Sequence, residues 1–261
     1  MRFPSVLMLA YMNEEAVGKA IAKCGVPREE LFITTKAYIQ QMGYEKTKGA
    51  FEESLNKLGL TYLDLYLVHM PFGDYYGSWR ALEELYQEGK IRAIGACNVT
   101  VEQVKEYLKY GQLDIIQEKF SIIDRKVERN GLKELCEQEG ITLQAYSPIE
   151  QGLLTGTVSR DYVLPPLHTH NKQFWWADER RNSVIDMVDS WKPLCEKYSC
   201  TPGNLAIAWS IAYSKQMNVL CGARKLHQIR DNVHASQIQL TQEDFSLMKD
   251  RADALINQYM R

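Results

Sequence analysis

The chain of 261 residues is 45% hydrophobic and carries 31 basic against 33 acidic side chains, a formal charge of −2. This length and apolar content can bury a substantial core, in one α/β barrel as readily as in two smaller domains. A charge so near zero gives no field that favours nucleic acid or an anionic membrane, so neither is an expected partner. A small-molecule ligand is the better expectation.

The cysteines and the first residues of the chain indicate the cellular compartment in which the protein is expected. Six cysteines lie in unrelated segments without CxxC pairs, and we interpret them as free thiols in a reducing compartment, with disulfide bonds as the alternative. The opening RFPSVLMLAYM is followed at once by Asn13, Glu14 and Glu15 and has no small-residue cleavage site, so it reads as a strand and not as a signal peptide. No apolar run is long enough to span a membrane. We therefore expect a cytoplasmic protein.

The first predicted strand, Ser5 to Ala10, ends just before Tyr11, and Asn13 is then expected to cap a helix. The run LFITTK predicts a second strand that closes on Lys36, and YLDLYLVH predicts a third that closes on His69. In both runs, β-branched or large apolar residues end at one proton-handling side chain. This pattern is typical of a buried parallel strand that opens into an active site.

The segment between these two strands is YEKTKGAFEESLNKLG. It has Phe51, Leu55 and Leu58 on one helical face and charged residues on the other. The pattern predicts an amphipathic helix that Gly59 closes in a left-handed conformation. A strand, a long helical connection and a further strand imply a parallel pair joined by a right-handed crossover.

The same order of helix, glycine and strand recurs along the chain. A helix opened by Ser78 precedes the strand IRAIGACN, and a helix with a Thr100–Gln103 capping box precedes LDIIQ. GLKELCEQEG then precedes ITLQAYSP. A period of about thirty residues per unit is typical of a (β/α)8 barrel or a doubly wound sheet.

The last third of the chain is less regular. Gln151 to Glu179 is predicted to be a long loop over the barrel mouth. Its His168 and His170 are spaced HxH, but no carboxylate or cysteine ligand lies nearby in sequence, so no metal site is expected. Thr201 and the proline after it start a strongly apolar helix. MNVLCG is the last predicted strand, and two helices close the chain.

The count of predicted strands is seven, whereas a complete barrel needs eight. We expect an α/β fold, a (β/α)8 TIM barrel that forms a single domain over residues 1–261 and in which the first βα unit is missing or altered. The predicted strands end near Ala10, Lys36, His69, Asn98, Gln117, Tyr146 and Cys221.

Four motifs in combination resemble the aldo-keto reductase family, and most nearly its bacterial type with a GAR cofactor motif near the C-terminus. YMNEEAVGKAI resembles the family's YGNE segment, FITTK its lysine strand, YLDLYLVHMP its histidine strand, and AYSPIEQGLLTG its loop over the cofactor. The likeness runs from Tyr11 to about Leu255. It implies NAD(P)H-dependent reduction of an aldehyde or ketone on a (β/α)8 barrel, without a metal.

The resemblance implies three catalytic residues: Tyr11, Lys36 and His69. Hydride delivered to a carbonyl carbon leaves an alkoxide, which needs a proton from an acid within hydrogen-bond reach, and Tyr11 fits that role. A phenol with a pKa of about 10 is a weak donor at neutral pH, and the Lys36 ammonium would lower that pKa. His69 would orient the substrate oxygen by a hydrogen bond. Successive strand ends are neighbours around one rim of a barrel.

The family's cofactor positions can be carried over one by one. Asn98 and Gln117 match the positions that bind the carboxamide, and Tyr146 matches the ring that stacks on the nicotinamide. Arg224 supplies a planar, permanently charged fork suited to a 2′-phosphate, which favours NADP, with NAD possible. The other implied cofactor contacts are Ser147, Ile149 and Gln151 along the pyrophosphate, and Gly222, Ala223, Gln228, Asp231 and Asn232 around the adenosine phosphate.

The chain departs from the family pattern mainly at its start. Val6 stands where the family has an acidic residue paired with the lysine, so Lys36 would lack its carboxylate partner. Only ten residues precede Tyr11, where the family has a further strand and helix. A buried lysine without its partner shifts towards the neutral amine and becomes a poorer activator of the phenol. Other departures are Cys97 for Ser, Val99 for Phe and Met12 for Gly.

Two other functions stay open on the sequence. The departures at Val6 and at the chain start favour a catalytically weak, cofactor-binding barrel that acts as a sensor or partner subunit. A Schiff-base lyase or aldolase that uses Lys36 would keep the barrel, but it would leave Arg224, Asn98 and Gln117 without a purpose. The sequence names neither the carbonyl substrate nor the oligomeric state.

Overall fold

The structure, a computed structural model, describes residues 3–6 and 13–260. The chain divides into two compact units. Unit 1 comprises Met1–Glu118 and Val127–Gln144, and unit 2 comprises Lys119–Lys126 and Ala145–Arg261. The single domain and the missing or altered first βα unit both stay predictions.

The sheet follows the order of the sequence, β1-β2-β3-β4-β5-β6-β7, over the described residues. Its pairs from β1 to β5 are parallel. The seven strands confirm the predicted number and order, because each run of β-branched and apolar residues forms one strand. Their bounds are β1 (Phe3–Val6), β2 (Leu31–Ala37), β3 (Leu65–Val68), β4 (Ile94–Cys97), β5 (Ile115–Lys119), β6 (Thr142–Tyr146) and β7 (Met217–Val219).

Strand β1 lies beside the strand that carries Lys36. Phe3 is opposite Leu31, and Val6 is opposite Thr34. The strand therefore begins two residues before the predicted start at Ser5, while residues 7–10 of the predicted strand lie outside the described residues. Tyr11 also lies outside them.

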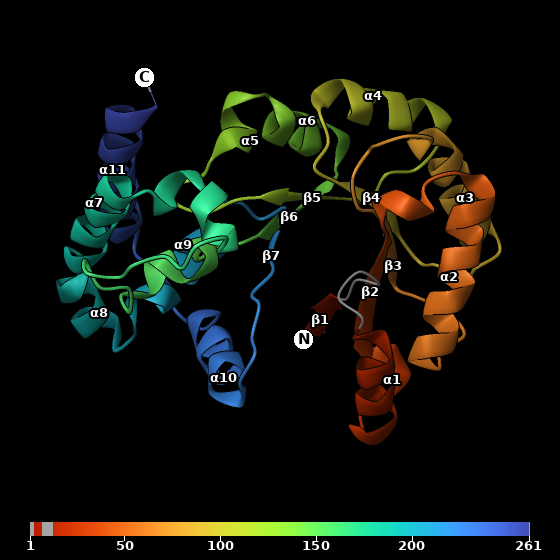
Figure 1. Cartoon of the computed structure of the whole chain (residues 1–261), viewed down its shortest axis with the longest axis horizontal. Coiled ribbons are helices and arrows are strands. Elements are labelled where there is room, and N and C mark those ends of the chain that lie inside the picture. Colours follow the sequence, from red (N-terminus) through yellow and green to blue (C-terminus); the bar gives the residue numbers. More distant parts are fainter. Residues whose placement is uncertain (1–2, 7–12, 261) are drawn as a thin grey trace. The chain divides into compact units, whose positions relative to one another are not determined.

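Three helices of unit 1 pack in a row (Figure 1): α1 (Glu14–Lys23), α2 (Tyr44–Leu58) and α3 (Tyr75–Gln87). The middle helix, α2, contacts both of the others, α2 also contacts β2, and α3 contacts β3. In α2, Phe51, Leu55 and Leu58 are buried, and Gly59 ends the helix with φ 66°. The amphipathic prediction is confirmed, because the apolar stripe of this helix faces its neighbours and the sheet. Unit 1 also contains α4 (Val101–Tyr110) and α6 (Leu132–Glu139), and α5 (Lys126–Arg129) begins at the boundary between the units.

The helix starts agree with prediction in part. The Thr100–Gln103 capping box of α4 is present. The predicted start of α3 at Ser78 is wrong, because Asp74 caps this helix by accepting a hydrogen bond from the backbone N of Gly77 at 2.8 Å. Ser78 is buried instead, and its hydroxyl accepts from the backbone N of Gly43. Asn13 stands at the N-cap position of α1 but makes no side-chain capping bond.

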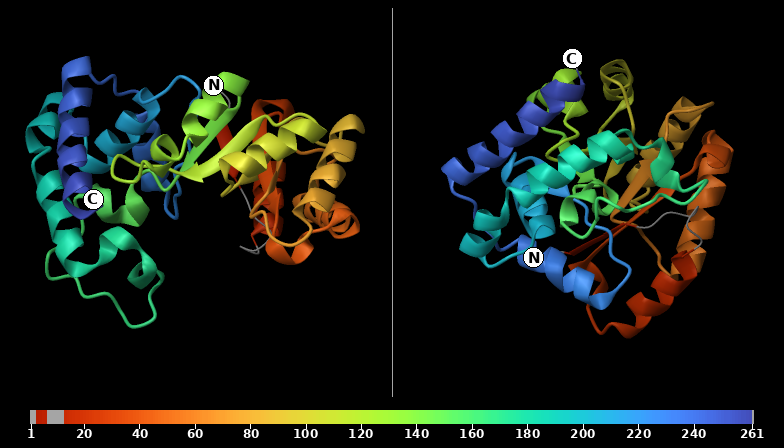
Figure 2. Two further views of the ribbon diagram at one scale, coloured as in Figure 1. Left: turned by 90° about the horizontal axis from the view of Figure 1, so that it is seen from above. Right: turned by 60° about the vertical axis from the view of Figure 1, so that its left-hand side comes forward.

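Unit 2 is built mainly from helices: α7 (Asp178–Asp189), α8 (Lys192–Tyr198), α9 (Pro202–Ala212), α10 (Leu226–Ala235) and α11 (Gln242–Tyr259). Helix α9 starts at Pro202, as predicted, and is buried along most of its length. It packs against α10 and against η4 (Glu150–Thr155), and α11 packs against α7 (Figure 2). The predicted long loop contains η4, η5 (Thr169–Lys172) and η6 (Phe174–Trp176), all short 3₁₀ turns.

Candidate active site

Lys36 is the penultimate residue of β2 and is buried, with 7% of its surface exposed. Its ammonium donates a hydrogen bond to the Oε1 atom of Gln117 on β5. Within the described ranges it forms no ion pair with a carboxylate. A buried cation needs polar partners to offset its desolvation, and here the partner is an amide oxygen.

Gln117 links Lys36 to Gln144, a residue that the sequence did not single out. The Nε2 atom of Gln117 donates to Oε1 of Gln144 on β6 at 2.5 Å, and each glutamine is 2% exposed. A glutamine amide has two N–H donors and two acceptor lone pairs. The Oε1 atom of Gln117 also accepts from the thiol of Cys97 at 3.8 Å, so among the described residues Gln117 keeps one N–H donor for a further partner.

His69 directly follows β3 and is half-buried. Its ring stacks on Tyr38 with centroids 5.3 Å apart. Burial, and then the nearby charge of Lys36, lower the pKa of His69 to about 4. The imidazole is therefore neutral at pH 7, with one N–H donor and one acceptor nitrogen. Its Nδ1 atom is buried and contacts no hydrogen-bond partner among the described residues.

Asn98, directly after β4, connects this strand to β3 and β5 by hydrogen bonds. Its Nδ2 atom donates to the backbone oxygen of His69 at 3.2 Å, and its backbone N donates to the backbone oxygen of Gln117 at 3.2 Å. Its φ of 55° lies in the left-handed region, which is uncommon for a residue other than glycine. The preceding Cys97 is buried, and burial raises the pKa of its thiol to about 12. Contacts within unit 1 thus connect Lys36, His69, Asn98 and Gln117.

The predicted pyrophosphate loop lies in unit 2, directly after β6. Tyr146, half-buried, is the last residue of that strand. Ser147 (φ 59°) and Gln151 (φ 56°) both adopt left-handed backbone conformations. Such conformations are strained in residues other than glycine and persist only where surrounding contacts fix them. Ile149 is half-buried and Gln151 is exposed.

The contacts that fix this loop converge on Glu150, which the sequence reasoning missed. Glu150 is 1% exposed, and its Oε2 atom lies 2.8 Å from the ammonium of Lys119. Its Oε1 atom accepts from the hydroxyl of Ser121 at 2.6 Å, and its backbone oxygen accepts from the indole of Trp176 at 3.3 Å. Burial raises the pKa of the Glu150 carboxyl, although Lys119 and Ser121 oppose the rise. No local sequence pattern marks this residue, because its partners come from distant segments.

The predicted adenosine segment follows β7. Gly222, Ala223 and Arg224 are exposed. Gln228 holds the backbone of this segment, because its Oε1 atom accepts from the backbone N of Arg224 at 2.7 Å. Asn232 donates to the backbone oxygen of Gly222 at 3.4 Å. The side chain of Asp231 is exposed, and its backbone oxygen accepts from Asn204 of α9 at 2.8 Å.

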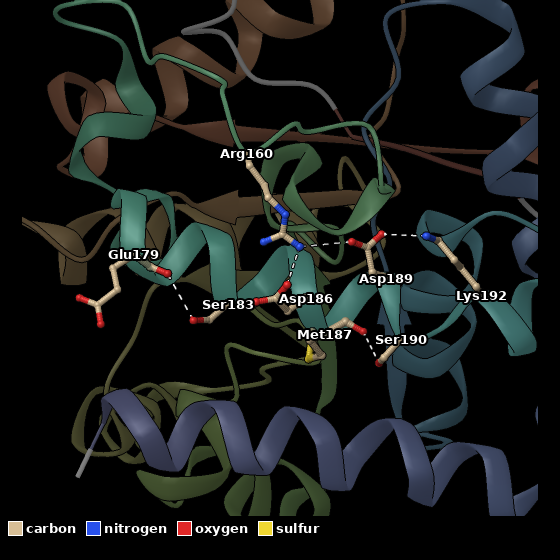
Figure 3. Close-up of polar contacts among 8 residues, drawn as sticks. All are labelled: Arg160, Glu179, Ser183, Asp186, Met187, Asp189, Ser190 and Lys192. Atoms are coloured by element: carbon tan, nitrogen blue, oxygen red, sulfur yellow. Dashed lines mark hydrogen bonds and ion pairs between the residues drawn. The ribbon is translucent and has the colours of Figure 1, made fainter.

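A small pocket of about 220 Å³ lies elsewhere in unit 2. At its rim, Arg160 contacts Asp186 at 2.5 Å and Asp189 at 3.5 Å (Figure 3), and Asp189 also pairs with Lys192. The pocket is smaller than the usual range for cofactor sites, and its lining contains none of the predicted site residues. It is lined by Leu153, Gly156, Val158, Ser159, Arg160, Ile185, Val188 and Asp189.

The described part of the chain contains neither a metal-binding cluster nor a membrane-spanning helix. No group of three or more His, Cys, Asp or Glu residues there is arranged to hold a metal ion. No helix there has the length and apolar content that crossing a membrane requires.

Comparison with known proteins gives consistent matches. The model of the aldo/keto reductase family matches residues 9–253. The chain is 41% identical to the NADH-specific methylglyoxal reductase of Escherichia coli (strain K12), over 93% of this chain and 80% of that protein. It is 37% identical to the glyoxal reductase of Bacillus subtilis (strain 168), over 94% of this chain and 75% of that protein.

Solved structures agree in fold. A thermostable aldo-keto reductase matches with a TM-score of 0.77 and 25% identity, over 94% of this chain and 81% of that one. The glycerol dehydrogenase of Gluconobacter oxydans matches with a TM-score of 0.86 and 23% identity, over 98% of this chain and 81% of that one. The predicted resemblance and the α/β barrel class are confirmed. The chain belongs to the aldo/keto reductase family, whose members are NAD(P)H-dependent oxidoreductases that reduce carbonyl groups on a TIM barrel.

Proposed function

We propose that the chain reduces small aldehydes or ketones with NADPH, with Tyr11 as the proton donor and Lys36 and His69 beside it. The observation that carries this proposal is the arrangement at the strand ends of unit 1. There a buried ammonium lies close enough to a neutral imidazole to lower the pKa of His69. The buried cation favours the phenolate of a neighbouring tyrosine and so eases its loss of a proton.

The neutral state of His69 fits its proposed role. A neutral imidazole can donate one hydrogen bond to the substrate oxygen without holding a charge that would compete with Lys36. The stacked ring of Tyr38 and the Asn98 bond to the backbone of His69 fix the position of the imidazole. When bound, the nicotinamide supplies the hydride, and the chain supplies and orients the proton.

The residues of unit 1 fit a nicotinamide carboxamide. Gln117 is fixed by Lys36 and the Cys97 thiol at its oxygen and by Gln144 at its NH₂ group, and it keeps one N–H donor. A carboxamide offers an acceptor oxygen for this N–H. This pairing supports Gln117 as a cofactor residue.

The residues of unit 2 fit an anionic adenosine moiety. Arg224, Lys225, His227 and Arg230 are exposed around the start of α10, with Asp231 as the nearest acidic residue in sequence. The guanidinium of Arg224 could hold a 2′-phosphate through two parallel hydrogen bonds. This supports NADPH as the preferred cofactor, although the Escherichia coli relative is named NADH-specific.

Short 2-oxoaldehydes are the substrates to test first. Two relatives, at 41% and 37% identity, are named for the reduction of methylglyoxal and glyoxal. Both compounds are small and carry adjacent carbonyl groups, which makes the carbonyl carbon that accepts hydride more electrophilic.

The decisive test is Tyr11→Phe, which removes only the proton donor. We expect turnover of methylglyoxal to fall about 10²- to 10⁴-fold, the range of general-acid contributions, while the NADPH dissociation constant stays within a few-fold. The measurements are NADPH oxidation at saturating substrate and a fluorescence titration with NADPH. Wild-type turnover in this variant would show that Tyr11 is not the donor.

A catalytically weak cofactor-binding barrel is the second candidate, because Lys36 has no carboxylate partner among the described residues. Stopped-flow fluorescence with NADPH separates the two functions. Tight binding without carbonyl-dependent oxidation, over a panel of aldehydes and ketones that includes the 2-oxoaldehydes, would leave only a sensor or partner role.

A further inference from the structure

We infer that Gln144 is a positioning residue for the proposed reaction: together with Gln117 it holds the Lys36 ammonium through an amide relay in place of a carboxylate. This inference rests on the proposed function for its catalytic meaning. The relay itself, Lys36–Gln117–Gln144, consists of contacts within the chain and does not depend on the proposed function.

The relay joins strands that are not all neighbours. Lys36 is on β2 and Gln117 on β5, and β3 and β4 lie between these strands in the sheet. The two side chains therefore meet across one face of the sheet. Gln144, on β6, completes the relay from the far side of Gln117 at 2.5 Å. All three side chains are buried, so water does not compete for these hydrogen bonds.

Gln144 determines which end of the Gln117 amide faces Lys36. Because Oε1 of Gln144 is an acceptor, it holds the NH₂ group of Gln117 and directs the Gln117 oxygen to the ammonium. If the amide rotated by 180°, its NH₂ group would point at a buried cation. Removing the Gln144 acceptor removes the contact that holds the NH₂ group of Gln117 and leaves Lys36 with a less well-aligned partner.

An amide partner has a different electrostatic effect from a carboxylate. It orients the ammonium but does not neutralise it, so the whole charge of Lys36 acts on its surroundings. Two described titratable groups whose pKa this charge lowers are His69 and Cys97. Both are neutral at pH 7, so neither offsets the charge. Val6 occupies the position at which the family has an acidic residue, so the sequence offers Lys36 no carboxylate from that position. The relay supplies polar contacts to Lys36 instead.

The test uses Gln144→Leu, which keeps the approximate volume of the side chain and removes its acceptor. The direct measurement is the titration of Lys36 in cofactor-free protein, by NMR of lysine labelled with ¹³C at Cε, with Lys36→Met to assign the signal. We expect Gln144→Leu to lower the pKa of Lys36 by about one unit, a tenfold change in proton affinity, because a poorly aligned partner stabilises the charged form less. The basic limb of the kcat–pH profile should move in the same direction, with kcat about tenfold lower.

Two variants separate positioning from general loss of stability. Thr47→Val removes an equally buried hydrogen-bonding group of unit 1, whose hydroxyl contacts Ser78 at 2.9 Å, and it should alter the thermal unfolding midpoint but not the Lys36 titration. Gln144→Glu keeps an acceptor oxygen, so Lys36 in this variant should titrate much closer to the wild type than it does in Gln144→Leu. Gln117→Glu tests the same contact in a chain that keeps Gln144, and its carboxylate should raise the pKa of Lys36.

The outcomes distinguish this inference from the proposed function. A Lys36 titration that is unchanged in Gln144→Leu would overturn the role of Gln144, whether or not the enzyme is active, and one that is unchanged in Gln117→Glu would overturn the Lys36–Gln117 contact. If Gln144→Leu does not fold, Gln144→Met, which is close to glutamine in volume and lacks the amide, decides by the same criterion. A shifted titration in a chain that reduces no carbonyl would keep the relay and reject the proposed function.

Discussion

The two units present their candidate functional residues in opposite ways. In unit 1, Lys36 near the end of β2 and Gln117 in the middle of β5 are buried and hydrogen-bonded to one another. In unit 2, Gly222, Ala223 and Arg224 are exposed after β7. Buried groups can shift the acidity of their neighbours, whereas exposed groups can reach a large, charged ligand. Under the proposed function, we therefore expect the reacting groups and the carboxamide contact in the first unit, and the contacts to the adenosine end of the cofactor in the second.

The two units also differ in how their charged side chains are paired. Lys36 forms no ion pair with any described residue, and its neighbours His69 and Cys97 are neutral at pH 7. In unit 2, the buried Glu150 forms an ion pair with Lys119, and the charged side chains around Arg224 are exposed to solvent. Mutations in the first unit should therefore change rates and pH profiles. Mutations in the second should change affinities.

Among the variants that test this contrast between the units, we expect the largest effect, a loss of NADPH affinity, from Arg224→Ser. Loss of a bidentate contact to a 2′-phosphate should weaken NADPH binding about 10- to 100-fold, while NADH binding and kcat at saturating cofactor change little. Fluorescence titration with both cofactors measures it. Arg230→Ser, which removes an exposed arginine of the following helix α10, is the matched control for loss of positive charge. Equal losses for NADPH and NADH would contradict a 2′-phosphate contact at Arg224.

A smaller effect is expected from Glu150→Gln, which keeps the shape of the side chain and removes its charge. Among the described residues, Lys119 would then retain Asp124, at 3.0 Å, as its one ionic partner. We expect the free energy of unfolding to fall by about 1–3 kcal/mol and cofactor affinity to fall several-fold, because the loop after β6 loses its strongest anchor.

Urea unfolding and NADPH titration measure both effects of Glu150→Gln. Glu137→Gln in an exposed ion pair with Lys133 is the control and should change the free energy of unfolding by about 0.5 kcal/mol or less. If the two variants unfolded at the same urea concentration, Glu150 would not anchor the loop.

Local patterns in the sequence predicted most of the fold. The apolar runs ending at Lys36 and His69 predicted β2 and β3, and the stripe of Phe51, Leu55 and Leu58 predicted the buried face of α2. These features depend on residues close together in the chain. Helix α7 was missed because its buried positions include Arg181, which breaks the apolar pattern.

The contacts within the candidate site were less predictable. Gln144 contacts Gln117, which is 27 positions away, and Glu150 contacts Ser121, which is 29 positions away. Such pairs depend on which strand ends and loops the fold brings together, and no local spacing indicates them. The family resemblance named Lys36 and Gln117 but assigned them to different partners, and their mutual hydrogen bond became visible only in the structure.

The smallest predicted effect concerns the pH dependence of stability in unit 1. The pKa of His69 is about 4 in the folded chain, against about 6.5 for an unperturbed histidine. Between these values the unfolded chain binds a proton that the folded chain does not, so stability falls as the pH is lowered from about 6.5 towards 4. His69→Asn removes this contribution. Urea unfolding at pH 7, 6, 5 and 4.5 should therefore show a shallower loss of stability on acidification in the variant than in the wild type. Lys36→Met should reduce the slope by a smaller amount, because burial of His69 is the larger cause of its lowered pKa and would remain. Identical slopes in wild type and His69→Asn would mean that the imidazole is not desolvated, and the contrast between a buried reactive unit and an exposed recognition unit would lose its electrostatic basis.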